Sequence, residues 1–473
     1  MTDTLENVMT RRTDLQNDKA QLLSQIRRLD DALACVNVRI TEIQDVNRNT
    51  YTSNLPNEIL SAVFEAGLCL PPTSKYPPEK PFEILVSHVS RRWRSVALRT
   101  HRLWTEVSAN MWSSAVELLD LYLARSGGCL LDIKIKQIVG EDGDSNPEFE
   151  TRNFERHLKS LAPHAARWKN LSIHADFNRP LSELLSPLTD IYAPALGSFS
   201  LGQYAYCVDP RPTGATYIDL FTGGTPVLFS VELNGNFVYE VRPPRGVKYL
   251  SLRYCLNGLT HADLRDILQP MCGLTHLVVG GNIVRPTINQ EPVELPSVLS
   301  LDVFLLDSNA VGTLRCLHLP ALDTLTINGS PTSIFEFPQY YHPTYHTLRS
   351  LKLISNVNYY DTHSTTDIIT IFPSVQEIIF DGTDSTSVLH TLRNGESADR
   401  LLWPELQKIT VVPLSDTRRV TKTTILSRLT ELVESRAVSG QPITHIKLSS
   451  KMIKYADKKQ LQRLRENVLL EWV

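Results

Sequence analysis

Residues 322–328 read Leu-Asp-Thr-Leu-Thr-Ile-Asn, with apolar residues at Leu322, Leu325 and Ile327. Side chains of a strand alternate between its two faces, so Leu325 and Ile327 share one face and the polar residues around them share the other. The spacing apolar-x-x-apolar-x-apolar therefore predicts a strand with one buried face. The same spacing recurs at Leu130/Ile133/Ile135, Trp168/Leu171/Ile173, Leu196/Phe199/Leu201, Leu228/Val231/Leu233, Val247/Leu250/Leu252, Leu274/Leu277/Val279, Val298/Leu301/Val303, Leu348/Leu351/Leu353, Val375/Ile378/Phe380, Leu406/Ile409/Val411 and Ile443/Ile446/Leu448.

These units repeat at intervals typical of leucine-rich repeats. Their middle residues are from 19 (Val231 to Leu250) to 38 (Ile133 to Leu171) residues apart, and 24 to 27 residues apart in the centre. That repeat pattern also has Asn or Cys three residues beyond the last apolar position. The chain has such residues at Asn236, Cys255, Asn282 and Asn356.

The segments between the units indicate how the strands pair. Several have helical spacing, for example residues 262–268 and 424–435. A strand followed by a helix, repeated, gives parallel strands. We therefore expect residues 130–473 to form an α/β solenoid, an irregular leucine-rich-repeat horseshoe with parallel strands on its concave face. The alternative is an antiparallel domain of amphipathic strands. The residues expected to cap the C-terminal end are Leu461, Leu464, Val468, Leu469 and Trp472.

Residues 54–104 have a different pattern, which predicts helices. The stretch Leu55-Pro56-Asn57-Glu58-Ile59-Leu60 begins an apolar stripe with helical spacing, and proline suits a first helical turn. A second apolar stripe consists of Val86, Val89, Trp93, Val96 and Ala97, is flanked by Arg91, Arg92 and Arg94, and is followed by Leu103-Trp104. Between the two stripes, residues 69–81 are so rich in proline that they predict an extended insert.

This pair of stripes resembles an F-box, the small helical module that docks a protein onto a ubiquitin ligase. The resemblance implies an F-box over residues 51–108 with the Pro-rich insert at 69–81, followed by a linking helix within 109–129. It also implies a Skp-type linker as partner and, through it, a cullin–RING ligase. The residues implied to lie on the docking side are Leu55, Pro56, Ile59, Leu60, Val63 and Phe64. Val89 and Trp93 are implied first to pack the module and second to touch the partner.

Residues 1–50 predict one long helix, because neither proline nor glycine interrupts them. Apolar residues recur every seven positions at Val8, Leu15, Leu22, Leu29, Val36 and Ile43. A second series consists of Leu5, Arg12, Lys19, Ile26, Leu33 and Ile40. This heptad pattern predicts a coiled coil. Two interpretations stay open, namely a homodimer through residues 5–43 or a helix that folds against the rest of the chain. Many fungal F-box proteins resemble this chain in having such a helix before the F-box.

The composition restricts the classes of function. Of the 473 residues, 42% are hydrophobic and 21% are charged, and the net charge is −3, so neither nucleic acid nor a membrane is the expected partner. The seven cysteines are scattered without a C-x-x-C pair, which favours the reducing cytoplasm or nucleus, and the N-terminus shows no apolar signal core. No motif for phosphate binding, a metal site or a catalytic nucleophile is present. We therefore expect neither enzymatic activity nor a cofactor.

The strand residues between the apolar positions are expected to form a protein-binding face, because aromatic, charged and small polar residues alternate there. The residues expected to contact a target are Tyr249, Arg253, His276, Asp302, Phe304, Asn328, Lys352 and Glu377. The whole chain resembles F-box proteins with leucine-rich repeats, a group expanded in fungi. The resemblance implies a substrate-recognition adaptor of a Skp–cullin–F-box ubiquitin ligase for an unknown protein target. The alternative is a non-catalytic scaffold that assembles partners through the coiled coil and the repeats without ubiquitin transfer.

Overall fold

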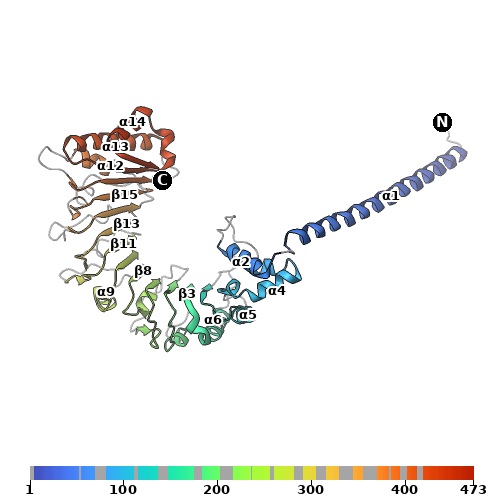
Figure 1. Ribbon diagram of the computed structural model, residues 1–473, viewed down its shortest axis with the longest axis horizontal. Coiled ribbons are helices and arrows are strands. Elements are labelled where there is room, and N and C mark those ends of the chain that lie inside the picture. Colours follow the sequence, from blue (N-terminus) through green and yellow to red (C-terminus); the bar gives the residue numbers. More distant parts are fainter. Residues whose placement is uncertain are drawn as a thin grey trace. The chain divides into compact units, whose positions relative to one another are not determined.

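The computed structural model (Figure 1) divides into two compact units, Met1–Leu103 and Trp104–Val473. The structure describes residues 5–52, 55–69, 81–110, 116–136, 147–174, 184–202, 217–235, 237–255, 260–281, 291–304, 316–329, 345–354, 369, 371–382, 385–394, 402–412 and 419–472. Most of the predicted Pro-rich insert (70–80) lies outside these residues, as do Asn236, Asn282 and Asn356.

The first unit consists of helices. They are α1 (Leu5–Thr52), α2 (Asn57–Leu68), α3 (Phe82–Ser87), α4 (Arg91–Arg99) and the first residues of the 3-10 helix η1 (His101–Trp104). Pro56 stands directly before α2, and its carbonyl accepts the first helical hydrogen bond from the Leu60 N–H at 3.1 Å. The second apolar stripe, over residues 86–97, falls on two helices, α3 and α4, with a break between them. The break has a local cause, because the Ser90 side chain caps α4 by accepting a hydrogen bond from the Trp93 N–H at 3.1 Å.

The second unit contains one sheet of 14 strands, and every neighbouring pair is parallel. The strands follow one another in chain order (Figure 1). They are β1 (Glu106–Asn110), β2 (Leu131–Lys136), β3 (Trp168–His174), β4 (Ser198–Gly202), β6 (Ser230–Asn234), β8 (Tyr249–Cys255), β9 (His276–Gly281), β11 (Ser300–Phe304), β13 (Thr324–Asn328), β14 (Ser350–Ile354), β15 (Glu377–Asp381), β16 (Lys408–Val412), β17 (His445–Leu448) and β18 (Leu469–Trp472).

The register of the strands aligns their apolar positions into two continuous buried rows. From β8 to β17, one row consists of Leu250, Leu277, Leu301, Leu325, Leu351, Ile378, Ile409 and Ile446. The other consists of Leu252, Val279, Val303, Ile327, Leu353, Phe380, Val411 and Leu448. Each of these side chains is at most 2% exposed, and each full burial contributes about 1.5–3 kcal/mol. The opposite side of the strands is half-exposed, and we call it the open face.

Helices and short sheets lie between the strands in the chain. The helices are α5 (Val116–Arg125), α6 (Pro147–Leu161), η2 (Ala162–Arg167), η3 (Ser186–Leu188), α8 (Phe237–Glu240), α9 (His261–Leu268), α12 (Thr386–Asn394), α13 (Arg419–Val438), η6 (Ser450–Tyr455) and α14 (Lys458–Asn467). Two short parallel pairs join β5 (Ile218–Asp219) to β7 (Val241–Arg242) and β10 (Val293–Glu294) to β12 (Leu317–His318).

One charged side chain of α13 ties a helix to the turn before β16. Arg436 is 0% exposed, and its guanidinium donates to the carbonyl of Trp403 at 3.0 Å and to the carbonyl of Leu402. Trp403 itself has a positive φ of 50°, which is unusual for a residue other than glycine. The buried guanidinium therefore satisfies two carbonyl groups at a constrained turn.

Three glycines end their strands in the same way. Gly235, Gly329 and Gly382 directly follow β6, β13 and β15 and have φ values of 76°, 126° and 67°. Each donates its N–H to the carbonyl of the residue in the next strand that pairs with the last residue of its own strand, at 2.9, 2.8 and 2.6 Å. A left-handed backbone suits glycine because it has no Cβ. The Asn-Gly and Asp-Gly pairs at these positions are thus the recurrent turn signal of this array.

The architecture agrees with an α/β solenoid of parallel strands, and not with an antiparallel domain. Every predicted unit coincides with a strand of the large sheet. In the first repeat of the array, the buried residues differ from the prediction, because Leu131 is buried and Leu130 is 47% exposed. The sheet also extends beyond the predicted units at both ends. Strand β1 begins within the residues assigned to the F-box, 51–108, and ends in those assigned to the linking helix, and β18 lies within the residues assigned to the cap.

Candidate docking and recognition surfaces

The helical module of the first unit has a small core of its own. Leu60 and Phe64 of α2, both 1% exposed, are buried together with Val86 of α3 and with Val96 and Ala97 of α4. The rings of Phe64 and Trp93 pack with their centroids 5.0 Å apart. This core fixes α2 against α4, so the remaining side of α2 is free to carry other contacts.

Hydrogen bonds between α2 and α4 reinforce this packing. The Ser61 and Thr100 hydroxyl groups lie 2.8 Å apart. The Arg92 guanidinium donates to the Asn57 side-chain oxygen at 3.1 Å and to the carbonyl of Leu55. Arg92 thereby holds the chain that leads into α2.

Four apolar side chains of the module are about half exposed or more, and thus are not buried in its core. Ile59 and Val63, one turn apart on α2, are 49% and 52% exposed. Leu85 on α3 is 47% exposed, and Val89, which follows α3, is 59% exposed. Half-exposed aliphatic side chains on two packed helices favour the binding of another protein. We call Ile59, Val63, Leu85 and Val89 the outward apolar residues.

A second concentration of side chains lies on the open face at β8, β9 and β11. The Arg253 guanidinium stacks over the Phe304 ring, 4.2 Å from its centroid, and the Tyr249 and His276 rings have centroids 6.5 Å apart. We call Tyr249, Arg253, His276 and Phe304 the Arg253 platform. Gly280 lies between two of its members, since a Cβ there would be 3.1 Å from the Phe304 Cβ and 3.3 Å from the Arg253 Cγ.

The platform covers small residues and is flanked by carboxylates. Ser251 and Val278, which share its strands, are only 1% and 2% exposed. Burial, and then the negative charge of Glu232, raises the pKa of the Tyr249 phenol, and the negative charge of Asp302 adds to this effect. The platform is thus an aromatic and guanidinium surface with negative charge beside it.

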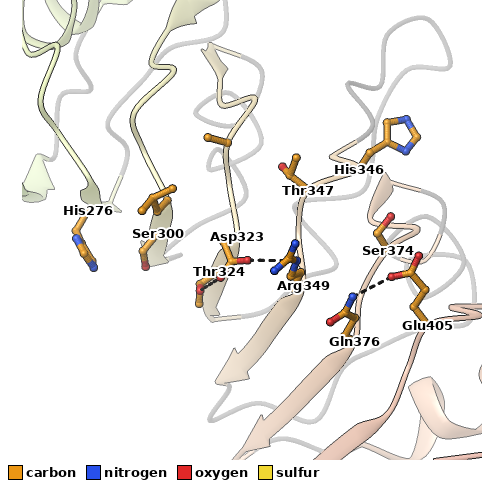
Figure 2. Close-up of a pocket in the computed structure, with 12 residues that line it drawn as sticks. His276, Ser300, Asp323, Thr324, His346, Thr347, Arg349, Ser374, Gln376 and Glu405 are labelled. Carbon is orange, nitrogen blue, oxygen red and sulfur yellow. Dashed lines mark hydrogen bonds and ion pairs between the residues drawn. The ribbon is translucent and has the colours of Figure 1, made fainter.

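A hollow adjoins the platform along the ends where the strands begin (Figure 2). It has a volume of about 690 Å³, and His276 belongs both to it and to the platform. An ion pair between Arg349 and Asp323 (3.8 Å) and a hydrogen bond from Gln376 to Glu405 (3.0 Å) line it. Its lining mixes apolar residues, such as Leu299 and Ala321, with charged ones, such as Asp323 and Arg349. Small-molecule pockets are mostly apolar, so this mixed lining suits a stretch of a protein chain with both polar and apolar side chains.

Two features are absent from the part of the chain that the structure describes. No group of three His, Cys, Asp or Glu side chains within it is arranged to hold a metal ion. None of its helices has both the length and the apolar character needed to cross a bilayer.

The comparison with known protein families identifies the helical module. Residues 52–110 match the F-box-like family. None of the curated proteins compared matches the chain. The match covers α2, α3, α4, η1 and β1. F-box domains bind Skp-type linkers in cullin–RING ligases, so the outward apolar residues lie on a module of a docking family.

The F-box-like module separates the predicted docking residues into two groups. Ile59, Val63 and Val89 are exposed, as is Pro56, and Leu55 is half-buried. Leu60 and Phe64 were expected on the docking side, but both are buried in the core of the module, on a different side of α2 from Ile59 and Val63. Trp93 is half-buried against Phe64. Leu85, which was not among the predicted residues, joins the exposed group.

The array brings only some of the predicted target-binding residues together. Tyr249, Arg253, His276 and Phe304 form the platform, and Asp302 lies beside it on β11. Farther along the open face are Asn328, Lys352 and Glu377, and Lys352 forms an ion pair with Asp381 at 3.0 Å. The sequence did not predict the residues that directly precede the strands and line the hollow, such as Asp323 and Arg349. They could have been found from their constant position in the repeat, directly before the first residue of each strand.

Proposed function

We propose that this protein is a substrate-recognition adaptor of a Skp–cullin–F-box ubiquitin ligase, in which the F-box-like module docks a Skp-type linker and the repeat array binds a target protein. The observation that supports the proposal best is the contrast within α2. Leu60 and Phe64 hold the module together, while the half-exposed Ile59 and Val63 remain available to a partner. A surface of this kind belongs to a module that matches the F-box-like family.

Docking would gain free energy from the outward apolar residues. Each of Ile59, Val63, Leu85 and Val89 has about half of its surface left to bury. Full burial of an aliphatic side chain contributes about 1.5–3 kcal/mol, so half contributes about 1 kcal/mol each. Four such side chains supply about 4 kcal/mol toward a complex, on which polar contacts at the edge would build specificity.

Target binding would use the Arg253 platform and the adjoining hollow. Tyrosine, arginine and other aromatic residues dominate the binding energy of protein interfaces, especially when other groups hold them in place. The Arg253 guanidinium is held by the Phe304 ring, and Tyr249 is held by burial and by a hydrogen bond from Arg253. Glu232 and Asp302 beside the platform favour a target segment that carries lysine or arginine.

The chain would hold the target close to the ubiquitin-charged enzyme and would not itself catalyse the transfer of ubiquitin. The ligase would deliver ubiquitin in trans, while this protein fixes the lysines of a target near the charged enzyme. In this proposal the chain has no catalytic residue and no resident cofactor, and it acts in the cytoplasm or the nucleus.

Co-purification with a Skp-type linker tests the proposal. The full chain and the linker, expressed together, are expected to co-elute in size-exclusion chromatography. The double variant Ile59→Asp/Val63→Asp should lose the complex, because the charges would lie at the centre of the docking surface. Val438→Asp is a matched control, since Val438 is 90% exposed at the end of α13 and lies in the other unit.

The result also decides against the rival function. If the folded wild-type chain forms no complex with the linker, the adaptor proposal is wrong. The long exposed helix α1 would then favour a scaffold that assembles partners without ubiquitin transfer. If the double variant still co-elutes as the wild type does, the docking surface has been assigned to the wrong side of α2.

A further inference from the structure

Helix α1 is 48 residues long, yet its apolar residues contact nothing in the structure that would bury them. Within the described part of α1, every residue from 7 to 43 is exposed. The apolar members of the heptad series are 47–80% exposed, and they are Leu5, Val8, Leu15, Leu22, Ile26, Leu29, Leu33, Val36, Ile40 and Ile43. Most helical stability in proteins comes from packing of an apolar face, so this face requires a partner.

The area of the face matches what a stable dimer needs. An aliphatic side chain that is about half exposed still shows roughly 80 Å² to solvent. Ten such side chains on each of two helices would bury roughly 1,600 Å², which is the size of a standard specific protein interface. The face is therefore large enough for association without help from the rest of the chain.

The types of residue from Leu22 to Leu29 favour two strands. In heptad notation, Ile26 occupies an a position between Leu22 and Leu29 at d positions, whereas farther on Leu33 occupies an a position and Val36 a d position. A β-branched residue at a with leucine at d favours a parallel two-stranded coil. Arg12 and Lys19 also occupy a positions. A cation at such a position fixes register and oligomeric state at some cost in stability.

The order of apolar and cationic layers favours a parallel arrangement. In a parallel pair in register, each layer from Leu22 to Ile43 meets its own copy. Lys19 of one helix would then lie beside Asp18 of the other, which is in the g position. In a fully overlapping antiparallel pair, Lys19 would face Leu29 and Arg12 would face Val36, so both cations would enter apolar layers.

We propose that α1 pairs with α1 of a second copy of this chain in a parallel, in-register, two-stranded coiled coil. The more stable half of the coiled coil comprises residues 22–43, and the less stable half comprises residues 5–19. The proposal does not depend on the ligase function. It states that two copies of the chain, each with an F-box-like module and a repeat array after α1 in sequence, are joined through α1.

The oligomeric mass of the full chain tests the pairing. Light scattering coupled to size-exclusion chromatography should give twice the chain mass of 53.4 kDa. Val36→Glu, at a d position, should raise the dimer dissociation constant at least about a hundredfold, because two carboxylates would face each other in the seam. Val38→Glu is the matched control, since Val38 is 60% exposed against 55% for Val36 but lies outside the seam. It should leave the dimer intact.

Cysteine cross-linking tests the orientation. In a background where the exposed Cys35, Cys69 and Cys272 are replaced by serine, Leu29→Cys should form an intermolecular disulfide on oxidation, since position 29 meets its own copy only in the parallel register. Asp31→Cys, on the outer side of the helix, should not.

Each other result overturns a defined part of the proposal. A monomer at micromolar concentration overturns the pairing, and a mass of three chains overturns the two-stranded state. A dimer that survives Val36→Glu overturns the seam. A dimer whose Leu29→Cys variant does not cross-link overturns the parallel register. Because none of these measurements involves a Skp-type linker, they stand apart from the test of the ligase adaptor.

Discussion

Truncation of Ile59 to alanine should weaken docking, whereas truncation of its neighbour Leu60 should weaken folding and leave docking unchanged. Removing three carbon atoms from a fully buried isoleucine or leucine costs about 2.4 kcal/mol at 0.8 kcal/mol per methylene. Ile59 is 49% exposed in the free chain, so about half of that cost, 1.2 kcal/mol, falls on docking. Because 1.4 kcal/mol corresponds to a tenfold change, Ile59→Ala should weaken the affinity for a Skp-type linker about sevenfold.

Leu60 is 1% exposed, so its truncation should act on folding alone. Leu60→Ala should lower the free energy of unfolding by about 2–5 kcal/mol, which includes the cavity left behind, and should leave the affinity of the folded fraction unchanged. Urea unfolding measures the first quantity, and calorimetric titration under conditions where each variant is folded measures the second. The reasoning is refuted if folded Leu60→Ala binds more weakly than Ile59→Ala.

Other perturbations test the packing of the array. Burial raises the pKa of Tyr345 to about 12 from an ordinary value near 10, so its contribution to stability is complete below pH 10 and is lost toward pH 12. At 1.36 kcal/mol per unit this is about 2.7 kcal/mol, and urea titrations from pH 8 to 12 should show a shallower alkaline loss in Tyr345→Phe than in the wild type. Arg436→Met should cost about 3 kcal/mol, because it leaves the two carbonyl groups before β16 unsatisfied, and a wild-type urea midpoint would contradict this. Gly223→Ala should lower the urea midpoint, with a cost of about 1–3 kcal/mol, because its Cβ would lie 2.8 Å from backbone atoms, whereas Gly246→Ala, with no atom within 4 Å, should not.

The strands could be predicted from the sequence because each has two buried positions separated by one open-face residue. That signal is local and was sufficient for every predicted unit. It failed to locate β1, where the buried residues are Val107 and Ala109, because the small alanine does not mark a buried position. It also chose Leu130 in place of Leu131 as the leading apolar position of the first repeat, although Ile133 and Ile135 of that repeat are buried as expected.

The site was less predictable because it depends on which side of an element meets a neighbour. The stripe of α2 contains both Ile59 and Leu60, and spacing alone does not separate the core side from the outer side. Only the packing of Phe64 on Trp93 makes that distinction. On the open face, the strand residues could be named, but the stacking of Arg253 on Phe304 joins side chains from β8 and β11 across Gly280, which a list of single strands does not reveal.

The parallel register of the sheet has a consequence for how this protein could change during evolution. Each strand of the large sheet bonds only to its two neighbours, and equivalent residues face one another along the whole sheet. The differences in repeat length lie in the segments between strands. Duplication or deletion of a whole repeat would therefore keep every remaining strand in phase. The reach of the recognition surface could be altered in single steps, while the gene segment that encodes the docking helices stays unchanged.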